Sequence, residues 1–319
     1  MLQLCPHLSY HVRSLTLPHI LSNDVYALLT QIAWPRLHTL SLYPAFDHSP
    51  TRDNINTLIS KASQLRKLSL SFQSALDCDT LYPLLHVSPS SLEVLTLQVS
   101  IKARSSGSCS PKLALPPKDP STYPRIRELI VDNSWNVLEM LVDARCPVDL
   151  THMHTLQYCD FASEAAGIGR PLEKMFHVAE PALRELHLNI SDPWMADIDP
   201  SSLSRLAHLH VQYSSGILTL LSKWPAQSNL SSILFHTVAS KIALTAEELQ
   251  EAAAAATPLF VFSRTLEDVV LRPGRFPQLT TVTISLNAWS SEEDAQEIRR
   301  QIQALFPRLH GKQMLAVHF

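Results

Sequence analysis

The chain has 319 residues, of which 45% are hydrophobic and 17% charged, with a formal net charge of −3 and an isoelectric point near 6.6. This balance leaves no basic surface for nucleic acid or anionic lipid, so we expect neither nucleic acid nor a membrane as a partner. The sequence contains no run of about 20 apolar residues, so we predict no membrane-spanning helix. The N-terminal residues lack a secretory signal, and the five cysteines are widely spaced without a Cys-x-x-Cys pair. These features predict a cytoplasmic or nuclear protein with reduced thiols.

The phrase Leu-x-x-Leu-x-Leu recurs along the chain. Leucines two residues apart are typical of a short strand, and recurrence at about 20–29 residues is typical of leucine-rich repeats. In chain order, the strong copies begin at Leu37, Leu65, Leu92 and Leu183. Weaker copies, in which other apolar residues replace some leucines, begin at Val12, Ile126, Met153, Leu206, Leu230, Leu266 and Leu279. The spacing between copies is unusually long before Leu266 and unusually short after it, which indicates that one repeat there is irregular.

Helical patterns lie between the predicted strands. Apolar residues at helical spacing predict helices over residues 24–33, 53–63 and 135–144. Capping patterns predict two more, over residues 246–256 and 292–306. Proline precedes several strands, as in Trp34-Pro35-Arg36-Leu37 and Phe276-Pro277-Gln278-Leu279, where it prevents the preceding helix from continuing. The repeating unit is therefore predicted to be strand, loop and helix.

These elements predict an α/β leucine-rich-repeat solenoid of about 10–11 irregular repeats, with a curved parallel sheet on the concave face and helices on the convex face. We expect residues 1–319 to form a single solenoid, because each repeat buries its apolar face only against its neighbours. Residues 100–121, rich in serine and proline, are expected to be a flexible insertion. Residues 290–319 are expected to form a C-terminal helix and a terminal strand that act as a cap.

The Pro-x-Leu-x-x-Leu-x-Leu strands at residues 35–42 and 181–188, with a looser copy at 277–284, resemble the leucine-rich-repeat region of fungal F-box proteins, especially those of basidiomycetes. The resemblance covers roughly residues 8–290. In that family an N-terminal F-box docks on Skp1 and the repeats hold a substrate for ubiquitination. The first predicted strand begins near Val12, which leaves no room for an F-box before it. Skp1 is therefore expected as a partner only if an F-box is missing from this chain.

Sequence motifs of enzymes are not found. Gly-x-Ser-x-Gly, the P-loop pattern and His-Glu-x-x-His are absent from the sequence. We therefore expect a non-enzymatic protein-interaction module without cofactors, related to the substrate receptors of F-box/leucine-rich-repeat ubiquitin ligases. One alternative is a stand-alone regulator similar to ribonuclease-inhibitor-type repeat proteins, with no ubiquitin-ligase link. Another is an enzyme whose motif is not recognised.

The third and fifth positions of the phrase project from the sheet on the side opposite the buried leucines, so they are the candidate partner-binding positions. The candidates among the charged or ionisable residues at these positions are Lys67, Glu128, Glu185, His187, His208 and His210. Neighbouring parallel strands lie about 4.8 Å apart, so we expect Glu185 beside His208 and His187 beside His210. Alternative interpretations of this patch are a pH-sensitive or metal-capturing site and a solvated surface without a role. We expect no metal ion there.

Overall fold

The computed structural model describes residues 6–18, 21–43, 49–72, 78–99, 118–132, 135–160, 169–190, 192–212, 214–238, 258–287 and 292–319. It contains two compact units, Met1–Ala182 and Leu183–Phe319, each with its own strands and helices. Most of the predicted insertion and all of the predicted helix at 246–256 lie outside the described residues. The prediction that residues 1–319 form a single solenoid stays a prediction.

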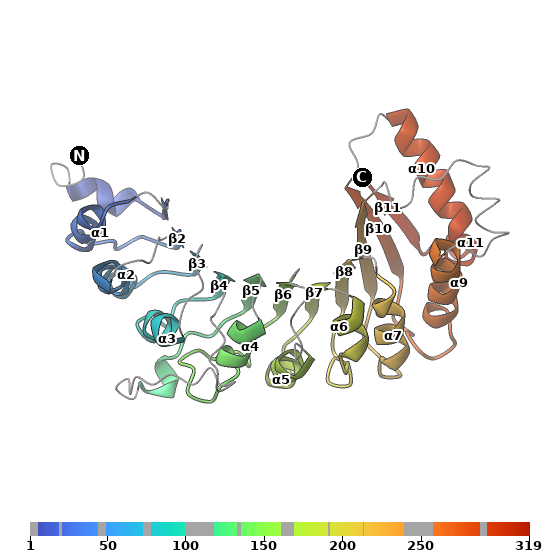
Figure 1. The fold of residues 1–319 in the computed structure, drawn as a ribbon, viewed down its shortest axis with the longest axis horizontal. Helices are drawn as coiled ribbons and strands as arrows, with labels where there is room; N and C mark the ends of the chain where they lie inside the picture. Colours follow the sequence, from blue (N-terminus) through green and yellow to red (C-terminus); the bar gives the residue numbers. More distant parts are fainter. Residues whose placement is uncertain are drawn as a thin grey trace. The chain divides into compact units, whose positions relative to one another are not determined.

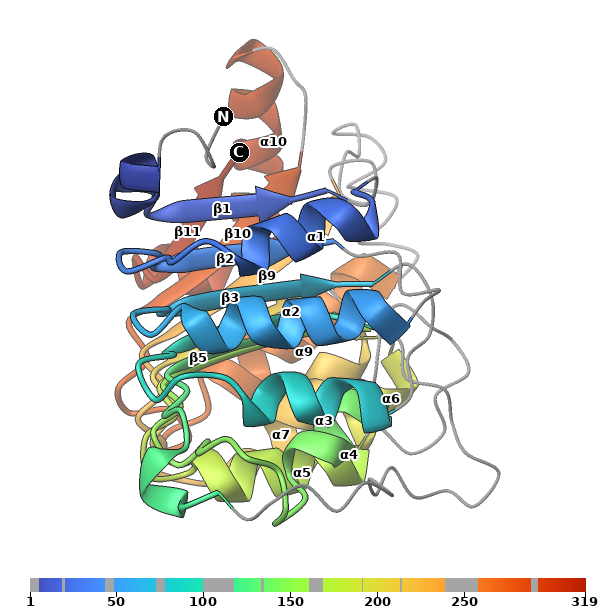
Figure 2. The same cartoon turned by 90° about the vertical axis from the view of Figure 1, so that its left-hand side faces the viewer.

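The first unit is a parallel sheet with helices on one face (Figures 1 and 2). Its strands follow chain order: β1 (Ser14–Leu17), β2 (Thr39–Leu42), β3 (Lys67–Ser71), β4 (Val94–Gln98), β5 (Glu128–Asp132) and β6 (Thr155–Asp160). Its α-helices are α1 (Asn23–Thr30), α2 (Ser49–Lys61), α3 (Cys78–His86), α4 (Trp135–Leu141) and α5 (Gly169–Ala179). Short 3-10 helices cover Pro6–His11 and Pro120–Thr122. Figure 2 shows α1 and α2 running alongside β1, β2 and β3.

The second unit repeats this plan. Its parallel strands, again in chain order, are β7 (Glu185–Ile190), β8 (His208–Gln212), β9 (Ser232–Val238), β10 (Thr281–Asn287) and β11 (Leu315–His318). Its described helices are α6 (Asp192–Asp197), α7 (Gly216–Lys223), α9 (Pro258–Val270), α10 (Glu292–Leu305) and α11 (Pro307–Gly311). The predicted C-terminal helix and strand are thus present as α10 and β11, and their role as a cap stays a prediction.

Several repeats enter the strand through a turn closed by the N–H of the first residue of the phrase. The Leu37 N–H donates to Trp34 O at 3.3 Å, and the Leu279 N–H donates to Phe276 O at 3.2 Å. In both turns proline is the second residue, where its fixed φ suits the turn geometry. The same hydrogen bond lies ahead of the strands that follow Leu65, Leu92, Met153 and Leu206. The turn therefore recurs with proline as its second residue before Leu37 and Leu279, and without proline at that residue in the other four repeats.

The carbonyl at the second position of the phrase fixes the register of the next strand. In the first unit, His38 O accepts from the N–H groups of Arg66 and Lys67 at 2.8 and 2.9 Å. In the second unit, Ala207 O likewise accepts two consecutive N–H groups of the following repeat, at 2.8 and 3.1 Å. Because a one-residue slip would turn every side chain to the opposite face, this bonding keeps the apolar positions of all strands on one side.

The apolar residues of the phrase form the core. Those at the fourth position are at most 1% exposed in every strand from β2 to β10: Leu40, Leu68, Leu95, Leu129, Leu156, Leu186, Leu209, Ile233 and Val282. They stack directly, since Leu40 pairs in register with Leu68, and Leu68 with Leu95. Burial of each such side chain contributes roughly 1.5–3 kcal/mol to folding. Together, the strand order, the register and the single helical layer of each unit confirm an α/β leucine-rich-repeat fold.

The prediction of a strand at Leu266-x-x-Val269-x-Leu271 is wrong. This segment belongs to helix α9, whose buried residues Phe262, Leu266 and Val270 recur every four residues. That spacing lines one face of a helix, and the leucine and valine three residues apart in the phrase fit a helix as well as a strand. Ten of the eleven copies of the phrase coincide with strands. Among the described residues, no helix is long and apolar enough to cross a membrane.

Candidate functional site

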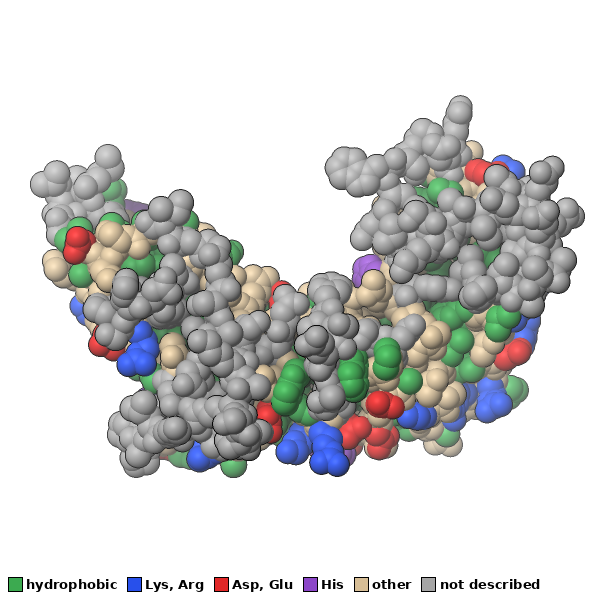
Figure 3. All heavy atoms as spheres, viewed as in Figure 1, with side chains coloured by type: hydrophobic (Ala, Val, Ile, Leu, Met, Phe, Trp, Pro, Cys, Tyr) green, Lys and Arg blue, Asp and Glu red, His purple; other side chains and the backbone are tan. Residues whose placement is uncertain are grey.

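The sheet face opposite the helices presents alternate side chains from each strand, and we call it the open face. In the second unit, one row of this face contains Glu185, His208, Ser232 and Thr281. The next row contains His187, His210, Leu234 and Thr283. All eight side chains are half-buried or exposed, whereas the residues between them are buried. Figure 3 shows that the Lys, Arg, Asp and Glu side chains facing the viewer gather mainly over the helices.

The predicted register of the histidines is confirmed. Glu185 of β7 pairs with His208 of β8, and His187 pairs with His210. The pairing follows from the repeat itself, because both residues of each pair occupy the same position of the phrase. The structure therefore brings four of the six candidate residues together on adjacent strands.

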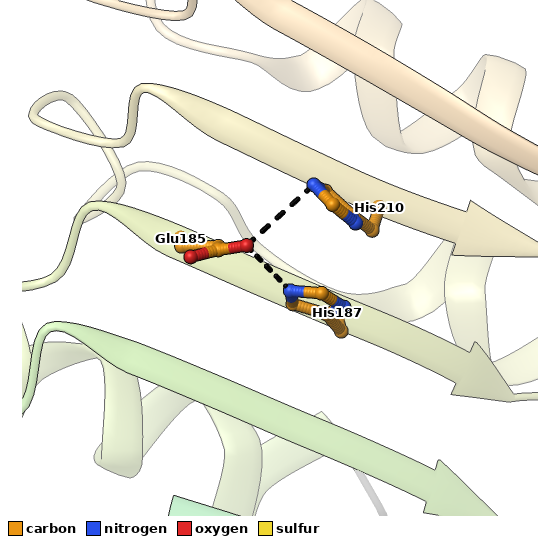
Figure 4. Close-up of side chains that lie close together, drawn as sticks. All are labelled: Glu185, His187 and His210. Atoms are coloured by element: carbon orange, nitrogen blue, oxygen red, sulfur yellow. Dashed lines mark hydrogen bonds and ion pairs between the residues drawn. The ribbon is translucent and has the colours of Figure 1, made fainter. Parts of the chain in front are cut away.

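Three of these side chains converge on one point, and we call Glu185, His187 and His210 the Glu-His-His cluster (Figure 4). His187 Nε2 donates to Glu185 Oε1 at 2.8 Å, and His210 Nε2 lies 3.7 Å from the same oxygen. The His187 and His210 rings pack with centroids 3.9 Å apart at an interplanar angle of 38°. One carboxylate oxygen thus faces a ring nitrogen from each of two neighbouring strands.

The environment favours a charged glutamate and a neutral histidine. Burial opposes ionisation of Glu185, but the hydrogen bond from His187 and the charges of the neighbouring histidines lower the pKa of this carboxyl. Burial, together with the charge of His187, lowers the pKa of His210 to about 4. Near pH 7 the His210 ring is therefore neutral, so one of its ring nitrogens is available as an acceptor or a ligand.

Two further histidines border the cluster. His208 shares a hydrogen bond with Ser232 Oγ on β9, with 2.8 Å from Nδ1 to the hydroxyl, which holds this ring toward β9. The His236 ring lies 6.3 Å from that of His210, and burial lowers the pKa of His236. Sequence reasoning missed His236, because it lies beyond the six-residue phrase. Continuing the strand alternation two residues past the fifth position, Leu234, would have found it.

The remaining candidates lie on the open face of the first unit and do not meet. Lys67 of β3 and Glu128 of β5 occupy the same row, with Val94 of β4 between them. Two inter-strand steps of about 4.8 Å separate their backbones. Sequence reasoning also missed a contact in this unit, where Gln98 Nε2 donates to Asp132 Oδ2 at 2.9 Å across β4 and β5.

Comparison with solved structures finds similarity to the leucine-rich repeat-containing protein LegL7 from Legionella pneumophila. The TM-score is 0.49 at 15% sequence identity, and the alignment covers 94% of this chain and 92% of LegL7. No protein-family model and no curated protein matches the sequence. The assignment of the fold therefore rests on the strand order, register and helical layers of this chain itself.

Proposed function

We propose that this chain is a non-enzymatic protein-interaction module that binds a protein partner on the open face of its sheet. The observation that supports this most is the regular placement of half-exposed polar side chains on strands whose register is fixed by backbone hydrogen bonds. A surface ordered in advance loses little conformational entropy on binding, so more of the contact energy appears as affinity.

The chemistry of the open face suits a folded protein. In the second unit, the two rows described above combine histidine, glutamate and hydroxyl side chains with one apolar residue, Leu234, across β7 to β10. Protein interfaces have this mixed character, with a few side chains carrying most of the binding energy. Nucleic-acid interfaces need clustered positive charge instead, and the net charge here is −3.

A finer assignment is a substrate receptor related to F-box/leucine-rich-repeat ubiquitin ligases. In that role the repeats would hold the substrate, and Skp1 would be recruited through an F-box. The support for this assignment is the sequence resemblance of the Pro-x-Leu-x-x-Leu-x-Leu strands. The second candidate is a stand-alone regulator that binds its partner in the same way but without ubiquitin machinery.

Affinity capture from a lysate of the source organism, followed by mass spectrometry, would identify partners for quantitative work. With a purified partner, Glu185→Ala/His210→Ala should weaken binding at least ~10-fold, since both side chains lie on the open face of the second unit and converge there. The matched control is His177→Ala/Glu180→Ala, which removes the same residue types from the exposed surface at the end of α5. This control should keep the wild-type affinity.

The variants separate the possible outcomes. Both double variants should keep a melting temperature close to wild type, because the substituted side chains lie outside the core. If the control weakens binding while the Glu185/His210 pair and a Lys67→Ala/Glu128→Ala pair do not, the partner does not use the open face and the proposal fails. Recovery of Skp1 with the chain supports the ligase assignment. A partner captured repeatedly without Skp1 favours the stand-alone regulator.

A further inference from the structure

The Glu-His-His cluster has the chemistry and the spacing of a metal site. From this convergence we propose that Glu185, His187 and His210 bind one divalent transition-metal ion, with Zn²⁺ as the best-matched ion. From the sequence we expect no metal here, because exposed histidines in a chain with 15 histidines usually serve only surface solvation. The proposal does not depend on a protein partner and can succeed or fail independently of the proposed function.

The distances within the cluster match the needs of a tetrahedral ion. Zn²⁺ binds imidazole nitrogen and carboxylate oxygen at about 2.0–2.2 Å, so tetrahedral ligand atoms lie about 3.3–3.6 Å apart. Glu185 Oε1 lies 2.8 Å from His187 Nε2 and 3.7 Å from His210 Nε2, on either side of that value. One ligand atom from each of the three residues lies within 4.8 Å of the others. Small side-chain rotations would therefore complete the geometry without moving the backbone.

Metal binding sets a condition on the imidazole tautomers. A metal-binding imidazole must carry no proton on the coordinating nitrogen. His187 Nε2 now donates to Glu185, so binding through that nitrogen requires the tautomer that carries the proton on Nδ1. The hydrogen bond would then be replaced by two bonds to the ion, one from each residue.

The surroundings leave the site with three protein ligands. His208 is already hydrogen-bonded to Ser232, and the His236 ring lies 6.3 Å from that of His210. The cluster itself is partly exposed, with 29% of the His187 side chain and 22% of the His210 side chain accessible. Water would therefore complete the coordination, as at zinc sites that have three protein ligands and an open position.

The donor set also selects the class of ion. Two imidazole nitrogens suit Zn²⁺ and its transition-metal neighbours, whereas Mg²⁺ and Ca²⁺ prefer oxygen ligands. The single carboxylate gives the site one negative charge for a dication. Because the other two ligands are nitrogens, the cluster lacks the oxygen ligands that Mg²⁺ and Ca²⁺ prefer. Mg²⁺ should therefore fail to compete with Zn²⁺ for this site.

Calorimetric titration of the full, chelator-treated chain with Zn²⁺ tests the proposal. We expect saturation at one ion that excess Mg²⁺ does not displace. Co²⁺ should produce the visible absorption of a low-coordinate site, and Zn²⁺ should remove it. Either His187→Ala or His210→Ala should weaken Zn²⁺ binding at least ~100-fold, since loss of an outer-shell partner alone costs about 10–100-fold. Glu185→Gln, which preserves the side-chain shape, should also weaken binding.

The His177→Ala/Glu180→Ala variant is the matched control and should bind Zn²⁺ as the wild type does. Melting temperatures measured without metal establish that the variants are folded. Imidazole NMR resonances give a direct readout, because those of His187 and His210 should shift on Zn²⁺ addition in the wild type. Absence of saturable Zn²⁺ binding overturns the proposal. So does binding that His187→Ala and His210→Ala leave unchanged, which would place the ion elsewhere among the 15 histidines.

Discussion

The stability of the C-terminal helices should depend on a single buried carboxylate, that of Glu267 in α9. Its side chain is 0% exposed, and its Oε1 atom accepts the backbone N–H groups of Arg308 and Leu309 at 2.7 and 2.9 Å. These are among the first N–H groups of α11, whose own N-cap residue, Phe306, provides no side-chain cap. Glu267 therefore caps a helix that lies far from it in the chain.

The size of the effect follows from what each substitution leaves unpaired. Glu267→Ala removes the acceptor of two N–H groups, and an unsatisfied buried donor costs about 1–3 kcal/mol, so we expect a loss of about 2–4 kcal/mol in the free energy of unfolding. Glu267→Gln keeps an oxygen for both donors but loses the negative charge, and its amide would face Arg264 Nη1, now 3.5 Å from Oε2. We expect this variant to lose about 1–2 kcal/mol.

Urea denaturation followed by circular dichroism would measure these losses, and hydrogen exchange of the Leu309 amide would localise them. The matched control is Asp268→Ala on the same helix, which removes an exposed ion pair with Arg308 and should cost less than about 1 kcal/mol. If Glu267→Ala costs no more than Asp268→Ala, or leaves exchange at Leu309 unchanged, the carboxylate is not the cap that we infer.

Three further substitutions should give distinct changes in the free energy of unfolding, measured by urea denaturation. Ser228→Ala should cost about 2–4 kcal/mol, because Ser228 Oγ accepts from Trp224 Nε1 at 2.9 Å and from a backbone N–H at 3.1 Å, both buried. Tyr158→Phe should cost about 1–3 kcal/mol, since the tyrosine hydroxyl donates to buried Asp160 Oδ2 at 2.8 Å. Tyr26→Phe should be neutral or slightly stabilising, within about 1 kcal/mol, because the Tyr26 hydroxyl is buried without a hydrogen-bond partner among the described residues. A loss at Tyr26 equal to that at Tyr158 would contradict this reasoning.

The Glu267 cap marks where sequence reasoning stops. The segment around Leu266 is predicted to be a strand because it matches the repeating phrase. Its apolar spacing also fits a helix, so the prediction is ambiguous. Once α9 is recognised as a helix, burial of the leucine face follows from its periodicity. The contact from Glu267 to Arg308 does not follow, because it depends on how two helices from different repeats pack. A glutamate inside a helical pattern is normally expected on the exposed face of the helix. The sequence therefore predicts an exposed Glu267, whereas its side chain is buried.

For the histidines the sequence predicts which residues lie side by side on neighbouring strands, but it does not predict how their side chains are oriented. Because β7 and β8 belong to consecutive repeats and share the same phrase, the pairing of His187 with His210 follows from counting. The orientation of the rings depends on side-chain rotation, which the repeat pattern does not specify. The same counting places Glu185 opposite His208, yet the Glu185 carboxylate turns toward His187 and His210.

This difference follows from strand geometry. When parallel strands pair in register, residues at the same position of consecutive repeats lie side by side, about 4.8 Å apart. Within one strand, residues two apart lie on the same face of the sheet. Any two open-face residues at the same or an adjacent position in consecutive repeats can therefore converge, even when a whole repeat separates them in the chain. The Glu-His-His cluster uses both relations, since Glu185 and His187 are two residues apart on one strand and His210 lies on the next. A repeat protein of this kind can acquire such a cluster of side chains through substitutions on the open face alone. Its leucine core and backbone hydrogen bonds already fix the spacing of the strands.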